Sequence, residues 1–141
     1  MQWIRRAHLV LAVAFVAGVV VQVFLAGLGV FDSPERFAVH ATWGYTLELL
    51  PIVLLVLALA GRLGRRQVIY PIVIFAMFIL QSVFVALRTD MPMVAALHPV
   101  NGFGILLVGI LMAREAWIAR GALEGAPSAS VTQAPAGENA S

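Results

Sequence analysis

The chain has 141 residues, of which 62% are hydrophobic and 11% are charged, against roughly 45–50% and about 25% in typical globular proteins. A water-soluble domain of this size cannot bury so much apolar surface, so the composition excludes an ordinary soluble enzyme and indicates a chain that lies in lipid. The net charge of +2 is too small and too dispersed for a nucleic-acid-binding surface. The absence of cysteine excludes disulfides, thiolate metal sites and cysteine nucleophiles.

Four apolar stretches are each long enough to cross a bilayer as a helix, which takes about 20 residues. The connections between them are short, so consecutive helices should be antiparallel neighbours in an up-down bundle. We therefore predict an all-α, polytopic membrane domain over residues 1–119, followed by a disordered tail over 120–141, where Ala, Gly, Ser and Pro dominate. The predicted spans are residues 7–31, 37–60, 68–87 and 94–113.

Arginine supplies all nine basic residues, and most of them flank the spans on one side of the predicted membrane. By the positive-inside rule, the two termini and the loop between spans two and three lie in the cytoplasm. The use of arginine in place of lysine favours a GC-rich genome, and hence the cell membrane of a bacterium. The arginines that set this orientation are Arg5, Arg6, Arg62, Arg65, Arg66, Arg114 and Arg120.

An internal repeat begins at the starts of spans two and four. DSPERFAVHATWG (32–44) and DMPMVAALHPVNG (90–102) share Asp, Pro, His and Gly at a single offset of 58 residues. Each half of the chain, roughly 8–60 and 68–117, is then a helical hairpin. Because two spans separate the copies, both hairpins have the same orientation, which makes the bundle a parallel repeat.

The repeat places His40 and His98 at equal depth on spans two and four. These spans lie diagonally across an up-down bundle, so the two imidazoles can face each other. A b-type haem suits such a pair, because its iron takes axial nitrogen ligands on both faces of the ring. The sequence therefore predicts that His40 and His98 are the metal ligands of a haem near the outer face.

Two further pairs of residues are candidates for contacts with the haem. Gly44 and Gly102 each follow a predicted ligand by four residues, so they lie on the same helix face and offer a flat surface to a macrocycle. Arg36 and Arg88 lie at the outer ends of their spans, where a guanidinium can bind a haem propionate in bidentate fashion.

The two histidines and the two glycines also have a plainer interpretation. His40 and His98 can form hydrogen bonds between helices, or bind another metal. Gly44 and Gly102 can simply allow close helix packing, as small residues do in membranes.

Other polar residues lie within the spans. Gln22 and Gln81 precede the two predicted ligands at similar distances, and we expect them to form inter-helix hydrogen bonds, with lining of the haem pocket as the alternative. Asn101 is expected to join helices in the same way, as is His8, which has no histidine counterpart in the repeat. Glu48 lies deep in span two, where an ionisable residue is a candidate for function, either as a protonated structural acid or in a proton path.

With its repeated hairpins and two histidines, the chain resembles half of the heme A synthase family over roughly residues 8–117. That family has two four-helix units, each with a histidine at the outer ends of its second and fourth helices, which correspond here to His40 and His98. The stretch LHPVNG (97–102) also resembles small, uncharacterised four-span membrane proteins. The chain has one unit, lacks the acidic residue expected about one turn before His40, and has no extracellular cysteine pair. The resemblance thus implies a haem-binding bundle and not haem hydroxylation.

Three functions follow from these observations. The leading hypothesis is a membrane protein that binds b-type haem and is not an enzyme by itself. Its role would be electron transfer, with quinol or a redox complex as partner, or haem binding alone. The second is a cofactor-free accessory or structural subunit of a membrane complex. The third is copper handling, because the thioethers of Met91 and Met93 lie close in sequence to His98.

Overall fold

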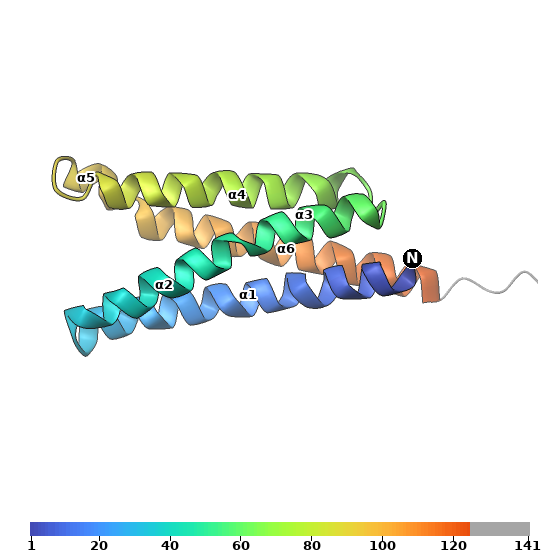
Figure 1. The fold of residues 1–141 in the computed structure, drawn as a ribbon, viewed down its shortest axis with the longest axis horizontal. Coiled ribbons are helices and arrows are strands. Elements are labelled where there is room, and N and C mark those ends of the chain that lie inside the picture. The colour runs from blue at the N-terminus through green and yellow to red at the C-terminus, as the bar shows by residue number, and fades with distance from the viewer. Residues whose placement is uncertain (125–141) are drawn as a thin grey trace, which may run out of the picture.

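The computed structural model describes residues 1–124, with side chains to residue 121, and this part of the chain is a helical bundle without strands (Figure 1). Four segments are long and apolar enough to cross a membrane: Gln2–Phe31, Pro34–Ala60, Arg65–Ala86 and Pro92–Gly121. The predicted all-α architecture with four spans is confirmed, and it is compatible with a multi-pass membrane protein. In chain order the elements are α1 (Gln2–Phe31), η1 (Pro34–Arg36), α2 (Phe37–Glu48), α3 (Leu50–Ala60), α4 (Arg65–Ala86), α5 (Pro92–Ala95) and α6 (His98–Glu124).

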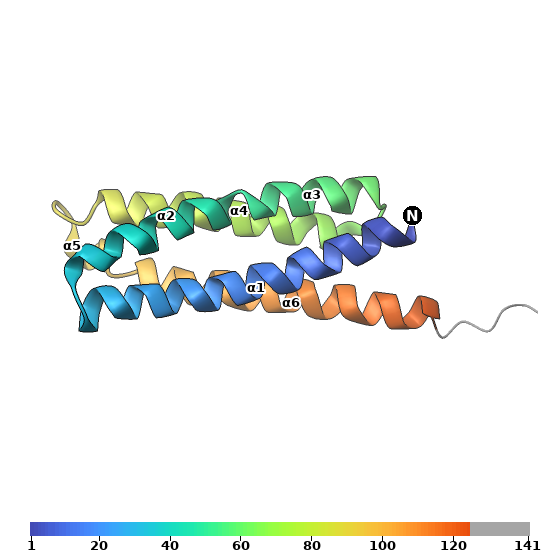
Figure 2. The same ribbon diagram turned by 60° about the horizontal axis from the view of Figure 1, so that its bottom comes forward.

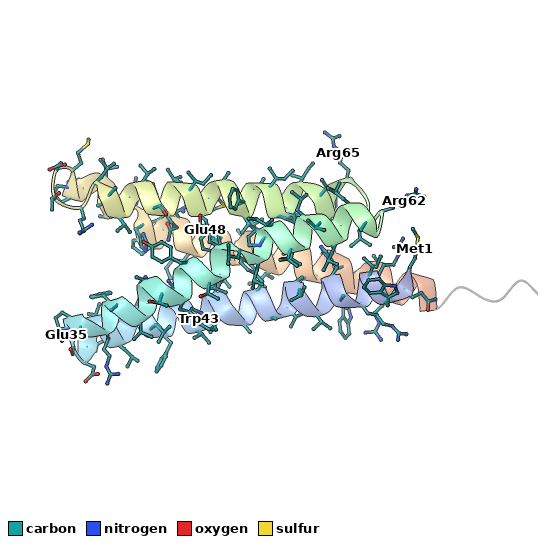
Figure 3. All side chains as sticks on the ribbon, viewed as in Figure 1. Met1, Glu35, Trp43, Glu48, Arg62 and Arg65 are labelled. Atoms are coloured by element: carbon teal, nitrogen blue, oxygen red, sulfur yellow. The ribbon has the colours of Figure 1, made fainter. Side chains whose placement is uncertain are left out.

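The spans pack around the bundle in chain order, as an up-down topology requires. α1 packs on α2 and α3, α3 packs on α4, α4 packs on α6, and α6 closes the ring against α1 (Figure 2). The second span therefore lies diagonally opposite α6. We call the end that carries η1 and α5 the histidine end, and the opposite end, with Met1, Arg62 and Arg65, the basic end (Figure 3).

The second span is broken between α2 and α3. Pro51 lacks an N–H, and its ring crowds the carbonyl one turn earlier, so the regular hydrogen-bond ladder is interrupted. Leu49 donates instead to the carbonyl of Thr46, at 3.4 Å. Beyond the break, α2 packs on α1 and diverges from α4, whereas α3 packs on both of them (Figure 1). The second span therefore packs against α4 toward the basic end and not toward the histidine end.

The buried residues of the two hairpins follow one repeat. Burial recurs at an offset of 59 residues between α1 and α4, and of 58 between the second span and α6. The core thus has the pseudo-two-fold symmetry of a parallel repeat, with its axis along the bundle. The buried pairs are His8 and Gln67, Ala12 and Pro71, Phe15 and Ile74, Val19 and Phe78, Leu47 and Ile105, Pro51 and Gly109, and Leu54 and Met112.

The structure corrects the predicted start of the tail. α6 continues to Glu124, so residues 120–124 are helical and not part of a disordered segment. Gly121 alone costs a helix only about 1 kcal/mol relative to alanine, and the residue types that follow it are good helix formers. The rest of the predicted tail, 125–141, lies outside the described residues.

Close packing of the first two spans depends on a glycine. A Cβ atom added at Gly18 would lie 2.5 Å from Cδ2 of Leu47, which is too close for any real contact. The same glycine accepts a hydrogen bond, because the indole N–H of Trp43 donates to its carbonyl at 2.9 Å. Small residues let membrane helices approach closely, and a polar side chain then joins them.

Candidate functional site: a histidine pair at the pseudo-two-fold axis

The structure brings the two predicted ligands together. His40 on α2 and His98 at the start of α6 face each other at the histidine end, with ring centroids 6.2 Å apart and ring planes inclined by 57°. Both side chains are half-buried. Because the residues are equivalent in the repeat, this contact straddles the pseudo-two-fold axis of the bundle.

Hydrogen bonds to α1 hold the ring of His40. Its Nδ1 lies 3.1 Å from the carbonyl oxygen of Gln22, so Nδ1 carries the proton and donates. The amide nitrogen of Gln22 lies 3.3 Å from Nε2 of His40 and donates to the backbone carbonyl of His40 at 2.9 Å. In this tautomer Nε2 keeps a lone pair, which the amide nitrogen of Gln22 faces at 3.3 Å, so a metal at Nε2 requires that amide to turn away. A ring that donates from Nδ1 to a carbonyl is the usual arrangement of metal-binding histidines.

His98 is held less fully. Its Nδ1 is buried and finds no hydrogen-bond partner of good geometry within residues 1–124, although the ring interacts with the backbone of Gln81. The side chain of Gln81 is engaged elsewhere, because its Oε1 accepts a hydrogen bond from Asn101 at 2.7 Å. The two hairpins therefore use equivalent glutamines differently: Gln22 is hydrogen-bonded to a histidine, and Gln81 is hydrogen-bonded to an asparagine.

A second pair of equivalent contacts lies next to the histidines. Trp43 donates to the carbonyl of Gly18 at 2.9 Å, and Asn101 donates to the carbonyl of Met77, also at 2.9 Å. Both donors and both acceptors are repeat equivalents. The expectation that Asn101 joins helices is confirmed. The part played by Trp43 is not evident from the sequence, since tryptophan and asparagine share little beyond a side-chain N–H.

The two predicted glycines make room for glutamine side chains. A Cβ atom at Gly44 would lie 2.9 Å from Nε2 of Gln22, and one at Gly102 would lie 3.5 Å from Nε2 of Gln81. In the structure, the space beside each glycine thus holds an amide. A macrocycle that lies against either glycine requires that amide to turn away.

The two predicted propionate partners have local partners of their own. Arg36 pairs with Asp32 one turn earlier, with an Nε to Oδ2 distance of 2.9 Å, and both side chains are about half exposed. Arg88 donates from Nη1 to the carbonyl of Val85 at 3.0 Å. Both arginines lie at the histidine end, as predicted, and the hydrogen bonds described above are to neighbours on their own segments and not to the histidine pair. Met91 and Met93, the candidate copper ligands, are exposed in the connection before α6.

Within the described residues, no group of three or more His, Cys, Asp or Glu side chains is placed to hold a metal ion. Glu48 ends α2 beside the break in the second span and is half-buried, away from both ends of the bundle (Figure 3).

The basic half contains polar contacts that sequence reasoning missed. Glu115 on α6 accepts hydrogen bonds from the hydroxyl of Tyr70 at 2.8 Å and from Arg66 at 2.9 Å. The expectation that His8 forms an inter-helix hydrogen bond is wrong: the side chain is completely buried, and neither ring nitrogen has a partner within residues 1–124. The repeat equivalent of His8 is Gln67. The two residues differ in type, so the sequence does not show that their positions are equivalent.

Comparison with known proteins adds one match. Residues 22–88 are similar to a family of unknown function, DUF6220. The matched stretch includes Gln22, His40 and Gln81, and it ends before His98. No curated protein and no solved structure matches the chain, so the resemblance to heme A synthase stays a prediction.

Proposed function

We propose that the chain is an integral membrane protein that binds one b-type haem between His40 and His98. The observation that carries the proposal is the spacing of the two rings. Two imidazoles that bind one metal ion from opposite sides, at metal–nitrogen distances of roughly 2.0–2.1 Å, keep their ring centres about 6 Å apart. The centroids of His40 and His98 are 6.2 Å apart.

The donor chemistry around the rings fits the same ligand. The proton of His40 is held on Nδ1 by the carbonyl of Gln22, which leaves Nε2 as the ligand nitrogen once the Gln22 amide, 3.3 Å away, turns aside. His98 has a buried Nδ1 without a good partner, and its ring interacts with the equivalent backbone of Gln81. The divergence of α2 from α4 leaves this end of the bundle able to adjust around a flat ring (Figure 1).

A haem with two histidine ligands is six-coordinate, and when bound it supplies one-electron transfer and not chemistry on a substrate. The chain's own residues hold and orient the ligands, because the carbonyl of Gln22 fixes the tautomer of His40. The basic end faces the cytoplasm under the positive-inside rule, so the proposed site lies near the outer surface, where a quinol or another redox partner can approach.

A second candidate function has its own support. Gln22, Trp43 and Asn101 all form hydrogen bonds between helices at the histidine end, as expected of a cofactor-free structural or accessory subunit. Under that alternative the histidines are packing residues, each hydrogen bond contributing roughly 0.6–2 kcal/mol to helix association.

The test is a reduced-minus-oxidised absorption spectrum of the full chain, purified in mild detergent from haem-supplied cells. We expect low-spin b-type bands near one haem per chain, lost in His40→Ala and in His98→Ala. His98→Met should keep the haem and raise its reduction potential, because methionine is also an axial ligand. Trp43→Phe, which removes a neighbouring hydrogen bond but no ligand, is the matched control and should retain the bands.

One variant separates the two candidate functions. Gln22→Leu keeps the backbone carbonyl that orients His40 but removes the amide that lies beside Gly44. If haem binds, this variant retains it and is less stable only in the haem-free state. A featureless spectrum of the wild-type chain, which persists after haem is added, would overturn the proposal in favour of a packing role.

A further inference from the structure

A cavity of about 80 Å³ lies at the basic end of the bundle. One water molecule needs roughly 10–15 Å³ on the same measure, so the cavity has room for several waters or for a small polar group. Its walls come from α1, α4, α6 and the connection before α4. The polar side chains that line it include Arg5, Arg6, His8, Gln67 and Arg120.

Two buried polar side chains that line this cavity have atoms without a hydrogen-bond partner. His8 is 0% exposed, and neither of its ring nitrogens has a hydrogen-bond partner within residues 1–124. Gln67 is 6% exposed; its Nε2 donates to the carbonyl of Met112 at 3.2 Å, while its Oε1 has no partner in that range. Native proteins rarely leave buried polar atoms unpaired, so these three atoms point to a bound group.

The two side chains are equivalent in the repeat, and this gives the cavity its position. His8 lies on α1 and Gln67 on α4, diagonally across the bundle, as His40 and His98 do at the other end on the second and fourth spans. The pseudo-two-fold axis therefore has a polar pair at each end. The pair at the basic end differs in its surroundings, because arginines from α1 and α6 line the same space.

The unpaired atoms specify what the bound group must offer. Arginine only donates, and donates well to the oxygens of phosphate. A neutral histidine has one donor and one acceptor nitrogen, and the free Oε1 of Gln67 only accepts, because its amide nitrogen is committed to Met112. A suitable ligand thus combines anionic oxygens, for the guanidinium of Arg5 and the donor nitrogen of His8, with a hydroxyl for the acceptors.

We propose that this cavity binds a phosphate group that carries or adjoins a hydroxyl. Two sources have that chemistry: hydrogen phosphate in solution, and the glycerol phosphate head group of phosphatidylglycerol at the membrane surface. Basic pockets between the ends of membrane helices are known sites for anionic head groups. The proposal rests on Arg5, His8 and Gln67; Arg120 also lies over the ring of Trp117, 6.0 Å from its centroid. It is independent of haem binding at the histidine end.

The test uses the full chain in detergent, freed of co-purified lipid, with binding followed by native mass spectrometry and by the thermal unfolding midpoint. The lipid probes are phosphatidylglycerol and phosphatidylcholine; the soluble probes are inorganic phosphate and sulfate, which has no hydroxyl at neutral pH. We expect phosphatidylglycerol to bind at least about tenfold more tightly than phosphatidylcholine, or phosphate at least about tenfold more tightly than sulfate. One hydrogen bond to a charged group changes a dissociation constant by about that factor. Selectivity in the lipid pair alone identifies a head group, and selectivity in the soluble pair identifies free phosphate.

Variants decide whether this cavity is responsible. Arg5→Gln and Gln67→Leu should each weaken the selective binding about tenfold. Arg65→Gln is the matched control, because it removes the same charge at the same end from an exposed side chain that does not line the cavity, and it should bind like the wild type. Equal binding of both members of each probe pair, or unchanged binding by Arg5→Gln and Gln67→Leu, would overturn the proposal and leave a cavity filled with water.

Discussion

The two ends of the bundle are held together by different interactions. The completely buried apolar side chains, such as Phe15, Leu54 and Met112, all lie in the half toward the basic end. Toward the histidine end, α2 buries only Leu47 among its 12 residues, whereas side-chain hydrogen bonds join helices toward both ends. In lipid, apolar burial between helices removes no surface from water, so packing and hydrogen bonds are alternative means of association. The histidine end, which has less apolar packing, is the one better able to rearrange around a ligand.

The largest difference between the halves should appear on removal of an aromatic ring. Phe15 is 0% exposed and packs edge to face on Phe78, whereas Phe103 is 62% exposed. Phe15→Ala should lower the free energy of unfolding by about 1–3 kcal/mol, less than in a soluble core because the cost is a cavity and lost packing, not transfer to water. Phe103→Ala should change it little. Reversible unfolding in mixed micelles measures both, and equal effects would contradict the proposed division of the bundle.

Glycine substitutions compare how closely the helices pack at Gly18 and at Gly102. Gly18→Ala places a Cβ atom 2.5 Å from Cδ2 of Leu47 and should cost about 1–2 kcal/mol, because the buried side chain of Leu47 must shift. At Gly102 the added atom lies 3.5 Å from the flexible end of Gln81, so Gly102→Ala should cost less than about 0.5 kcal/mol. The same unfolding assay applies, and a larger cost at Gly102 would show that the histidine half is the more tightly packed one.

The smallest effects should come from the hydrogen bonds that join helices at the histidine end. Trp43→Phe and Asn101→Leu each remove a donor to an equivalent backbone carbonyl, on Gly18 and Met77. Each should lower stability by about 0.6 kcal/mol and by no more than about 1.7 kcal/mol, the range measured for such bonds in membranes. Amide hydrogen exchange should rise in α2 and in the start of α6 while it stays unchanged in α3. Faster exchange at the basic end would show that the two ends of the bundle do not open independently of each other.

Much of this arrangement could be predicted from particular residues. The four apolar runs predict the spans, and the shared spacing around His40 and His98 predicts a parallel repeat that brings the two rings together. The expectation that Gln22 and Gln81 form inter-helix hydrogen bonds is confirmed. Their partners could not be predicted, because the choice of a histidine by Gln22 and of an asparagine by Gln81 depends on side-chain rotamers.

The polar pair at the basic end could not be predicted for a different reason. His8 and Gln67 differ in residue type, so only their shared burial reveals that they are equivalent. The length of α6 was underestimated because the composition changes before the helix ends.

The parallel repeat has a consequence for the origin and assembly of the chain. Each hairpin of the repeat crosses the membrane twice, so a duplicated hairpin has the same orientation in the membrane as the original, whichever orientation that is. A single ancestral hairpin could thus have formed the complete bundle as a symmetric pair of separate chains, with both axial polar pairs already built from identical residues. Two copies within one polypeptide can differ where two identical chains cannot, and here one axis carries two histidines at one end and a histidine with a glutamine at the other.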